Sequence, residues 1–136
     1  MSLRFTPSLL SRLRHRAQAM VGVSIAGLAQ RLIDEGLRMA DHPGVIFKDG
    51  PSGRRAALAY GPDIWEVVTF LGEVDERGPA AVEAAAEVFA VDASRISTAL
   101  SYYADYPDEI DAEIADADEA SRRAEDAWRV QQRLIS

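Results

Sequence analysis

The sequence contains no cysteine and a single lysine, Lys48. Without cysteine the chain can form no disulfide, no thiolate nucleophile and no Cys-ligated zinc site. No apolar run approaches the ~18 residues that a membrane-spanning helix requires, and the N-terminus lacks the apolar core of a secretory signal. We therefore expect a cytoplasmic protein without a membrane segment.

Sequence motifs of enzyme chemistry are also missing. The chain has no glycine-rich loop ending in Gly-Lys-Ser/Thr, and residues 108–119 lack the glycine of a calcium-binding loop. His15 and His42 stand far apart without ligand spacing, so we expect both to be bystanders. The clustered carboxylates after residue 105 could bind magnesium weakly, but we interpret them as the solvated face of a helix. The sequence thus predicts a protein that is not an enzyme and has no cofactor or bound metal.

Charge is distributed unevenly along the chain, although its net value of −7 is unremarkable for an acidic protein. Residues 1–40 carry six arginines and two acids, a net charge of +4, which leaves −11 for the remainder. Such segregation favours a basic segment that contacts phosphate and an acidic segment with another role.

The first 40 residues show one strand pattern and two helix patterns. Residues 3–6 alternate apolar and polar side chains with the period of a β-strand. Pro7 suits the first turn of a helix, Gly22 interrupts that helix, and Ser24 is a suitable N-cap for the next. The apolar helical positions are Leu9, Leu10, Leu13, Ala17 and Met20, then Ile25, Leu28, Ala29, Leu32, Ile33 and Leu37. Because a unit this small encloses little core, we expect it to form a homodimer.

This order of elements over residues 3–39 resembles the ribbon-helix-helix DNA-binding domains of the CopG, Arc and MetJ type. The resemblance implies that two copies pair their strands into an antiparallel ribbon that enters the major groove of double-stranded operator DNA. The side chains expected to face base edges are those of Ser2, Arg4 and Thr6. The residues expected to contact phosphate are Arg12, Arg16, and Val23 and Ser24 through their backbone N–H groups. The alternative is a frayed terminus before an ordinary helical hairpin.

Residues 41–44 break the second helix at a proline and predict a linker. Beyond it, residues 45–47 and 55–58 flank a turn-rich spacer, residues 48–53, which predicts a β-hairpin. Three helix patterns follow, over residues 63–72, 78–89 and 93–104. The short turn between the last two gives them the outline of a helix-turn-helix.

Residues 44–114, above all the run 96–111, resemble a small domain family of unknown function found in bacterial antitoxins and described as winged-helix-like. Its members commonly sit beside PIN-type nucleases, so the resemblance implies a toxin–antitoxin pair. Residues 93–104 form the candidate recognition helix, and Arg54 and Arg55 are a local basic cluster. Because residues 43–104 have nine acids and five bases, we favour a dimerisation or spacing role here over DNA contact.

The end of the chain predicts one long helix over residues 108–134. Eight of the fifteen residues from 105 to 119 are acidic and none is basic, whereas four arginines follow, an order that complements a helix macrodipole. A seam at heptad spacing contains small and polar residues, which favours docking in a partner's groove over a coiled coil. With the resemblance, the predicted toxin contacts are Ile110, Ile114, Ala124, Trp128, Arg129 and Arg133. A helix that folds back on its own second domain remains the alternative.

The sequence therefore predicts a mainly α protein with three parts. Residues 1–41 form the ribbon-helix-helix, residues 42–107 the hairpin and helical trio, and residues 108–136 the toxin-binding helix. The predicted function is an antitoxin that neutralises a PIN-type ribonuclease and represses its own operon. A stand-alone transcriptional regulator and a protein-interaction adaptor without DNA binding are the alternatives.

Overall fold

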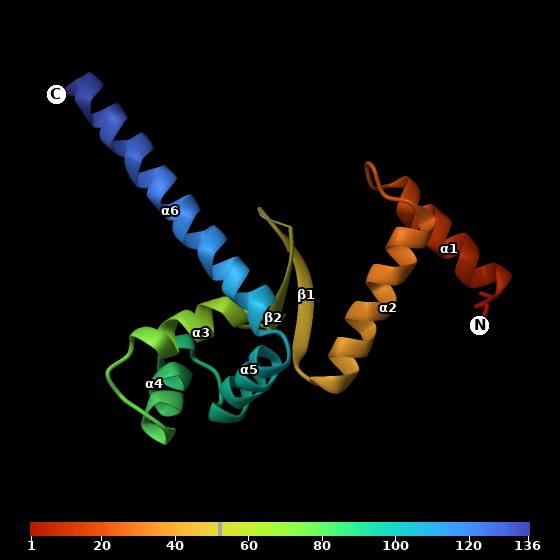
Figure 1. The fold of residues 1–136 in the computed structure, drawn as a ribbon, viewed down its shortest axis with the longest axis horizontal. Coiled ribbons are helices and arrows are strands. Elements are labelled where there is room, and N and C mark those ends of the chain that lie inside the picture. Colours follow the sequence, from red (N-terminus) through yellow and green to blue (C-terminus); the bar gives the residue numbers. More distant parts are fainter. Residues whose placement is uncertain (52) are drawn as a thin grey trace. The chain divides into compact units, whose positions relative to one another are not determined.

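The computed structural model describes residues 1–51 and 53–136, which form six helices and a two-stranded antiparallel hairpin (Figure 1). The prediction of a mainly helical chain with one hairpin is confirmed. Two compact units divide it: unit 1, Met1–Asp41, and unit 2, His42–Ser136. The C-terminal helix, predicted as a third segment, is part of unit 2. Within the described ranges no helix is long and apolar enough to cross a membrane.

Unit 1 contains helices α1, Pro7–Gln18, and α2, Ile25–Asp41. Thr6 caps α1, because its Oγ1 accepts a hydrogen bond of 3.2 Å from the Leu9 N–H, and Pro7 opens the first turn. Ser24 caps α2 in the same way, through a bond of 3.0 Å from the Gly27 N–H to its Oγ. Gly22 takes a positive φ of 73° in the turn between them. The predicted cap at Ser24, helix start at Pro7 and break at Gly22 are therefore present, whereas the cap at Thr6 was not predicted.

Residues 1–6 form no strand in the single chain. A strand is assigned from hydrogen bonds to a second strand, and within unit 1 both described elements are helices. Thr6 has extended backbone angles, φ −61° and ψ 151°. The ribbon-helix-helix arrangement is thus not confirmed by one chain, since its ribbon requires a second copy.

Unit 2 begins with strands β1, Val45–Gly50, and β2, Gly53–Leu58, which pair from Val45↔Leu58 to Gly50↔Gly53. The strands extend into the spacer predicted over residues 48–53, so the paired segments are longer than expected. Ser52, in that spacer, lies outside the described residues. Gly53 has a φ of 114°, which a residue with a side chain adopts only with strain.

Four helices follow the hairpin where the sequence predicts them. They are α3, Ile64–Glu73; α4, Pro79–Phe89; α5, Ala93–Asp105; and α6, Pro107–Ile135. Proline at the first position opens α4 and α6, and Ala90 in the left-handed conformation, φ 55°, ends α4. Val91 and Asp92 complete the short turn between α4 and α5.

The core of unit 2 gathers side chains from the hairpin and from all four helices. Its buried members are Val45, Ala56, Leu58, Ile64, Val67, Ala85, Ile96, Ala99, Tyr102 and Ile110. Ile110 belongs to α6, and Ile114 packs against the same core. From Asp118 onward every residue of α6 is exposed, and the helix continues well beyond the other elements of unit 2 (Figure 1). Helix α6 therefore has a docked half, residues 107–117, and a free half, residues 118–135.

Candidate functional site

Unit 1 leaves most of its large apolar side chains in contact with solvent. Its buried core consists of Leu13, Ala17 and Leu28. The large apolar side chains of unit 1 that remain exposed include those of Leu3, Phe5, Leu9, Ile25, Leu32, Ile33, Leu37 and Met39. Phe5, Leu9, Leu32 and Ile33 line one hollow. Exposed apolar side chains gathered in this way mark an interaction surface, which we call the apolar face of unit 1.

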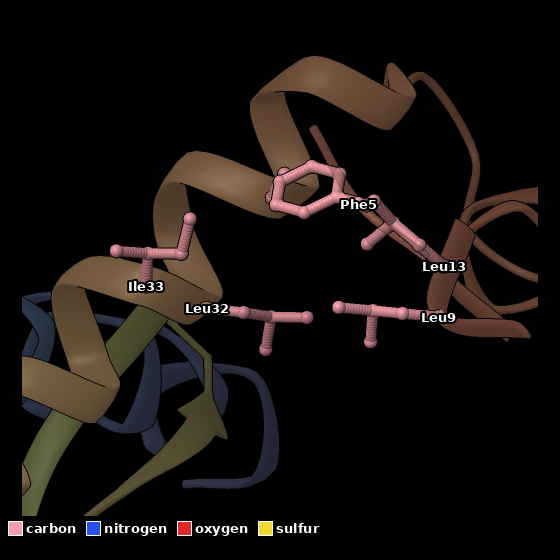
Figure 2. A pocket seen from close by; sticks show the side chains of 6 residues that line it. Phe5, Leu9, Leu13, Leu32 and Ile33 are labelled. Carbon is pink, nitrogen blue, oxygen red and sulfur yellow. The ribbon is translucent and has the colours of Figure 1, made fainter. Parts of the chain in front are cut away.

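An apolar hollow of about 100 Å³ lies within this face. The lining side chains come from the N-terminal segment and from both helices: Phe5, Leu9, Leu13, Ala29, Leu32 and Ile33. Figure 2 shows Leu9 of α1 and Leu32 of α2 pointing toward one another across the hollow, with Phe5 beside them. Since the exposed lining is entirely apolar, filling it with another apolar group removes unfavourable surface from water.

The residues predicted to meet DNA are all on unit 1, and most of them are exposed. Ser2, Arg4, Arg12, Arg16 and Ser24 are exposed, whereas Val23 is half-buried against the unit 1 core. The hydroxyl oxygens of Thr6 and Ser24 already accept the capping bonds of α1 and α2. Thr6 is exposed, and its side chain, which caps α1, retains its O–H donor and one acceptor lone pair, so the contact of Thr6 with a base stays a prediction.

The structure separates the residues predicted to contact a toxin into two groups. Ile110 is completely buried and Ile114 packs against the core of unit 2. Both predictions are corrected, because the seam side chains nearest the start of α6 dock that helix on its own unit. Ala124, Trp128, Arg129 and Arg133 lie on the free half, and Trp128 is 58% exposed. Of the six predicted toxin contacts, four therefore lie on the free half.

Arg129 is engaged on its own helix. Its Nη2 lies 2.6 Å from Oε1 of Glu125, and its Nη1 lies 3.9 Å from Oδ1 of Asp126. Exposed pairs spaced by one helical turn stabilise by only about 0.3–0.5 kcal/mol, so a partner carboxylate can displace Glu125 at small cost. Arg123 pairs with Glu119 in the same way, at 2.5 Å.

Helix α5 does not present a free basic surface. The Arg95 guanidinium donates to the backbone oxygen of Ala59 in the turn after β2, and the Thr98 hydroxyl donates to the Ser94 backbone oxygen at 3.1 Å. On the hairpin, Arg54 lies 3.4 Å from an Asp49 oxygen. Each of these side chains therefore has a partner within unit 2, and the dimerisation or spacing role of residues 42–107 stays a prediction.

A charge cluster that sequence reasoning missed joins the hairpin to α3. The Asp63 carboxylate is buried, with Lys48 Nζ 2.7 Å from its Oδ1 and Arg55 Nε 3.0 Å from its Oδ2. The indole Nε1–H of Trp65 also donates to Oδ2, at 3.1 Å. The sequence identifies Asp63 as a helix cap but carries no signal for this pairing, because the cations come from positions 15 and 8 residues away on two strands.

Glu113, on the docked half of α6, lies beside this cluster. Its partial burial, the Glu109 carboxylate and the Asp63 carboxylate raise its pKa from 4.5 to about 7, Arg55 lowers it and Asp116 raises it further. On the opposite side of the docked half, the Tyr103 hydroxyl donates to Oδ1 of Asp111 at 2.8 Å, and this bond raises the Tyr103 pKa.

His42, expected to take no part in catalysis, has a structural position. Its ring is buried, its Nε2 lies 2.8 Å from Oδ2 of Asp105, and its edge packs against the rings of Tyr102 and Tyr106 at 5.3 and 6.3 Å. The contact fastens the first residue of unit 2 to the end of α5. His15, by contrast, is exposed on α1.

The part of the chain that the structure describes contains no group of three or more His, Asp or Glu side chains arranged to hold a metal ion. Comparisons with protein-family models, with curated proteins and with solved structures each returned no match to this chain.

Proposed function

We propose that the protein is a homodimeric antitoxin that binds operator DNA through unit 1 and neutralises a PIN-type ribonuclease through the free half of α6. The observation that carries the proposal is the exposed apolar face of unit 1. Residues 1–40, which make up nearly all of this unit, have a net charge of +4. A small basic unit that cannot bury its own apolar side chains is the kind of unit that dimerises on DNA.

A second copy supplies what unit 1 lacks. Each fully buried leucine, isoleucine or phenylalanine contributes about 1.5–3 kcal/mol, and those around the hollow are only partly covered. When two such faces pair, each copy buries its own set of these side chains. The resulting free energy of burial is large compared with that of the three-residue core of the isolated unit.

The N-terminal segment then acquires the strand partner that one chain does not provide. In an extended strand, side chains alternate between faces, so with Phe5 in the hollow Arg4 points away from it. Two paired segments would present both copies of Arg4 on one outer face, as the resemblance to ribbon-helix-helix domains implies. Arg12 and Arg16, exposed and one helical turn apart on α1, would contact the phosphates in this arrangement.

The free half of α6 supports the second activity. It holds two large apolar side chains on one side of the helix, Trp128 and Ile135, and both are exposed. An exposed amphipathic helix with an aromatic anchor suits a groove on another protein. Its arginines provide cations for the acidic, magnesium-binding site that the resemblance implies for the toxin.

The experiment has two arms. Binding of the full-length protein to DNA from upstream of its own gene is measured by gel shift, and its capture and silencing of the product of the neighbouring reading frame are measured by co-purification and an RNase assay. Both activities are expected. DNA binding without capture would identify a stand-alone regulator, and capture without DNA binding would identify an adaptor.

A further inference from the structure

Glu113 occupies an unusual position at the interface between α6 and the rest of unit 2. It lies on the docked half of α6, one turn after the fully buried Ile110, where α6 packs against α3 and α5. Its side chain is half-buried. Its Oε2 atom is shielded from solvent and, among the described residues, accepts no hydrogen bond. A charged carboxylate in that position would have an unsatisfied oxygen.

The nearby cations are already committed to another carboxylate. Lys48 and Arg55 both pair with the buried Asp63, at 2.7 and 3.0 Å. Gly50 leaves room for Arg55 in this position, because a Cβ at residue 50 would overlap its guanidinium group. The absence of a side chain at residue 50 lets Arg55 cross the hairpin toward Asp63, and Glu113 is left without a cation of its own.

Charged groups face Glu113 from each neighbouring element. On α6 itself these are Glu109 and Asp116; Asp63 precedes α3, and Arg55 is on β2. Lys48 of β1 acts on the site through Asp63, and α5 contributes the Tyr102 hydroxyl, which donates to Glu109 at 3.1 Å. Three carboxylates therefore oppose the ionised form of Glu113 and one guanidinium favours it.

We propose that Glu113 makes the base of α6 a pH-responsive joint, in which the protonated carboxyl lets the docked half pack against α3 and α5 and ionisation of the carboxyl loosens that packing. The joint is a property of unit 2 alone. It does not depend on DNA binding or on a toxin. It does change how firmly residues 107–117 are packed, and the free half of α6 continues from these residues.

The direction follows from linkage. Because the pKa of Glu113 in the folded protein is about 7, above its ordinary 4.5, the docked state binds a proton more tightly than the released state. The stabilisation is complete below pH 4.5 and is lost as the pH rises through 7. The protection of the backbone amides of the docked half against hydrogen exchange should therefore fall as the pH rises through 7.

Two measurements on the full-length protein test the joint. Carbon-13 NMR of the side-chain carboxyls gives the titration midpoint of Glu113 directly, and hydrogen exchange, corrected for the intrinsic rate, gives the protection of residues 107–117 at pH 6 and pH 8. We expect a midpoint near 7 and a loss of protection of roughly tenfold, the change that one pKa unit produces.

Glu113→Gln keeps the side-chain volume and removes the charge, so its protection should change by less than about twofold over the same range. Asp118→Asn, an exposed acid on the free half of the same helix, is the matched control and should behave as the natural protein does. A Glu113 midpoint near 4.5, or the same loss of protection in Glu113→Gln as in the natural protein, would overturn the proposal. The NMR titration needs no variant and decides the question even if Glu113→Gln folds poorly.

Discussion

Lys48, the single lysine of the chain, places its Nζ 2.7 Å from Oδ1 of the buried Asp63. The pair connects β1 to the residue that precedes α3, and Arg55 of β2 holds the other carboxylate oxygen. Asp63 also begins α3, since its backbone N–H donates to Oε1 of Glu66 at 3.1 Å. One carboxylate therefore orients the hairpin against the first helix of unit 2.

Asp63→Asn should lower the free energy of unfolding of unit 2 by about 2–3 kcal/mol, because two cations and an indole N–H lose a charged acceptor. Lys48→Met should cost less than about 1 kcal/mol, since the lysine side chain is 43% exposed and Arg55 remains paired. Urea denaturation of the two variants gives both values. Equal costs would show that Asp63 acts chiefly through Lys48.

Glu113→Gln should stabilise unit 2 at pH 8 and have little effect at pH 5. The pKa of Glu113 is raised to about 7, so at pH 8 the natural side chain is ionised at an energetic cost that glutamine avoids. Because the group is about half exposed to solvent, we expect a gain of only about 1–2 kcal/mol. Thermal denaturation at the two pH values measures it, and a gain independent of pH would point to packing instead of charge.

Leu32→Asp should disrupt the homodimer. Leu32 lines the hollow of unit 1, so in the proposed dimer the substitution would bury an unpaired carboxylate. Gln30→Asp, which adds the same charge to an exposed position of α2 outside the hollow, is the control and should leave the dimer intact. Sedimentation equilibrium of the full-length variants decides the matter. A Leu32→Asp protein that remains fully dimeric would exclude this face as the interface.

The helices and the hairpin of this protein are predictable because their ends are encoded locally. Pro7, Ser24, Pro79 and Pro107 each start a helix by a rule that involves only a few neighbouring residues. The strand expected over residues 3–6 is different in kind, because a strand needs hydrogen bonds to a second strand, and a local sequence pattern cannot supply that partner.

The contacts between residues that are distant in the sequence could not be predicted from the sequence, for a related reason. The heptad spacing of α6 correctly groups Ile110 with Trp128 on one seam, but spacing cannot show that unit 2 covers the first and leaves the second in solvent. Likewise, His42 and Asp105 are 63 residues apart, so nothing in the sequence joins them. Periodicity predicts a face, and only the fold shows what lies against it.

Arg4→Ala should weaken operator binding by about 1–3 kcal/mol and relax the preference at one base position, as expected for the loss of a bidentate contact. Arg12→Ala should instead weaken binding to all sequences about equally and reduce its salt dependence, because a phosphate contact carries no sequence information. Arg14→Ala, two residues along α1, is the control. Gel shifts at several salt concentrations separate these effects, and an Arg4→Ala protein with unchanged selectivity would contradict the ribbon.

Removal of residues 118–136 should abolish toxin neutralisation and leave operator binding nearly intact. The cut falls after the docked half, so Ile110 and Ile114 stay in the core of unit 2 and the truncated chain keeps its fold. A toxin that is still captured and silenced by this chain would assign the interaction to the remainder of unit 2.

Within the free half, Trp128→Ala should weaken the toxin complex by about 2 kcal/mol or more, because a central aromatic anchor is lost. Val130→Ala, also exposed but two residues along the helix and therefore on another side of it, is the matched control and should change affinity little. Arg129→Ala should relieve inhibition more than it reduces affinity, since its guanidinium would exchange the exposed Glu125 for a carboxylate of the toxin's active site. Affinity by calorimetry and residual RNase activity, measured on the same variants, distinguish an anchor from a blocking residue. Equal losses of affinity for Trp128→Ala and Val130→Ala would show that the helix is not held by this seam.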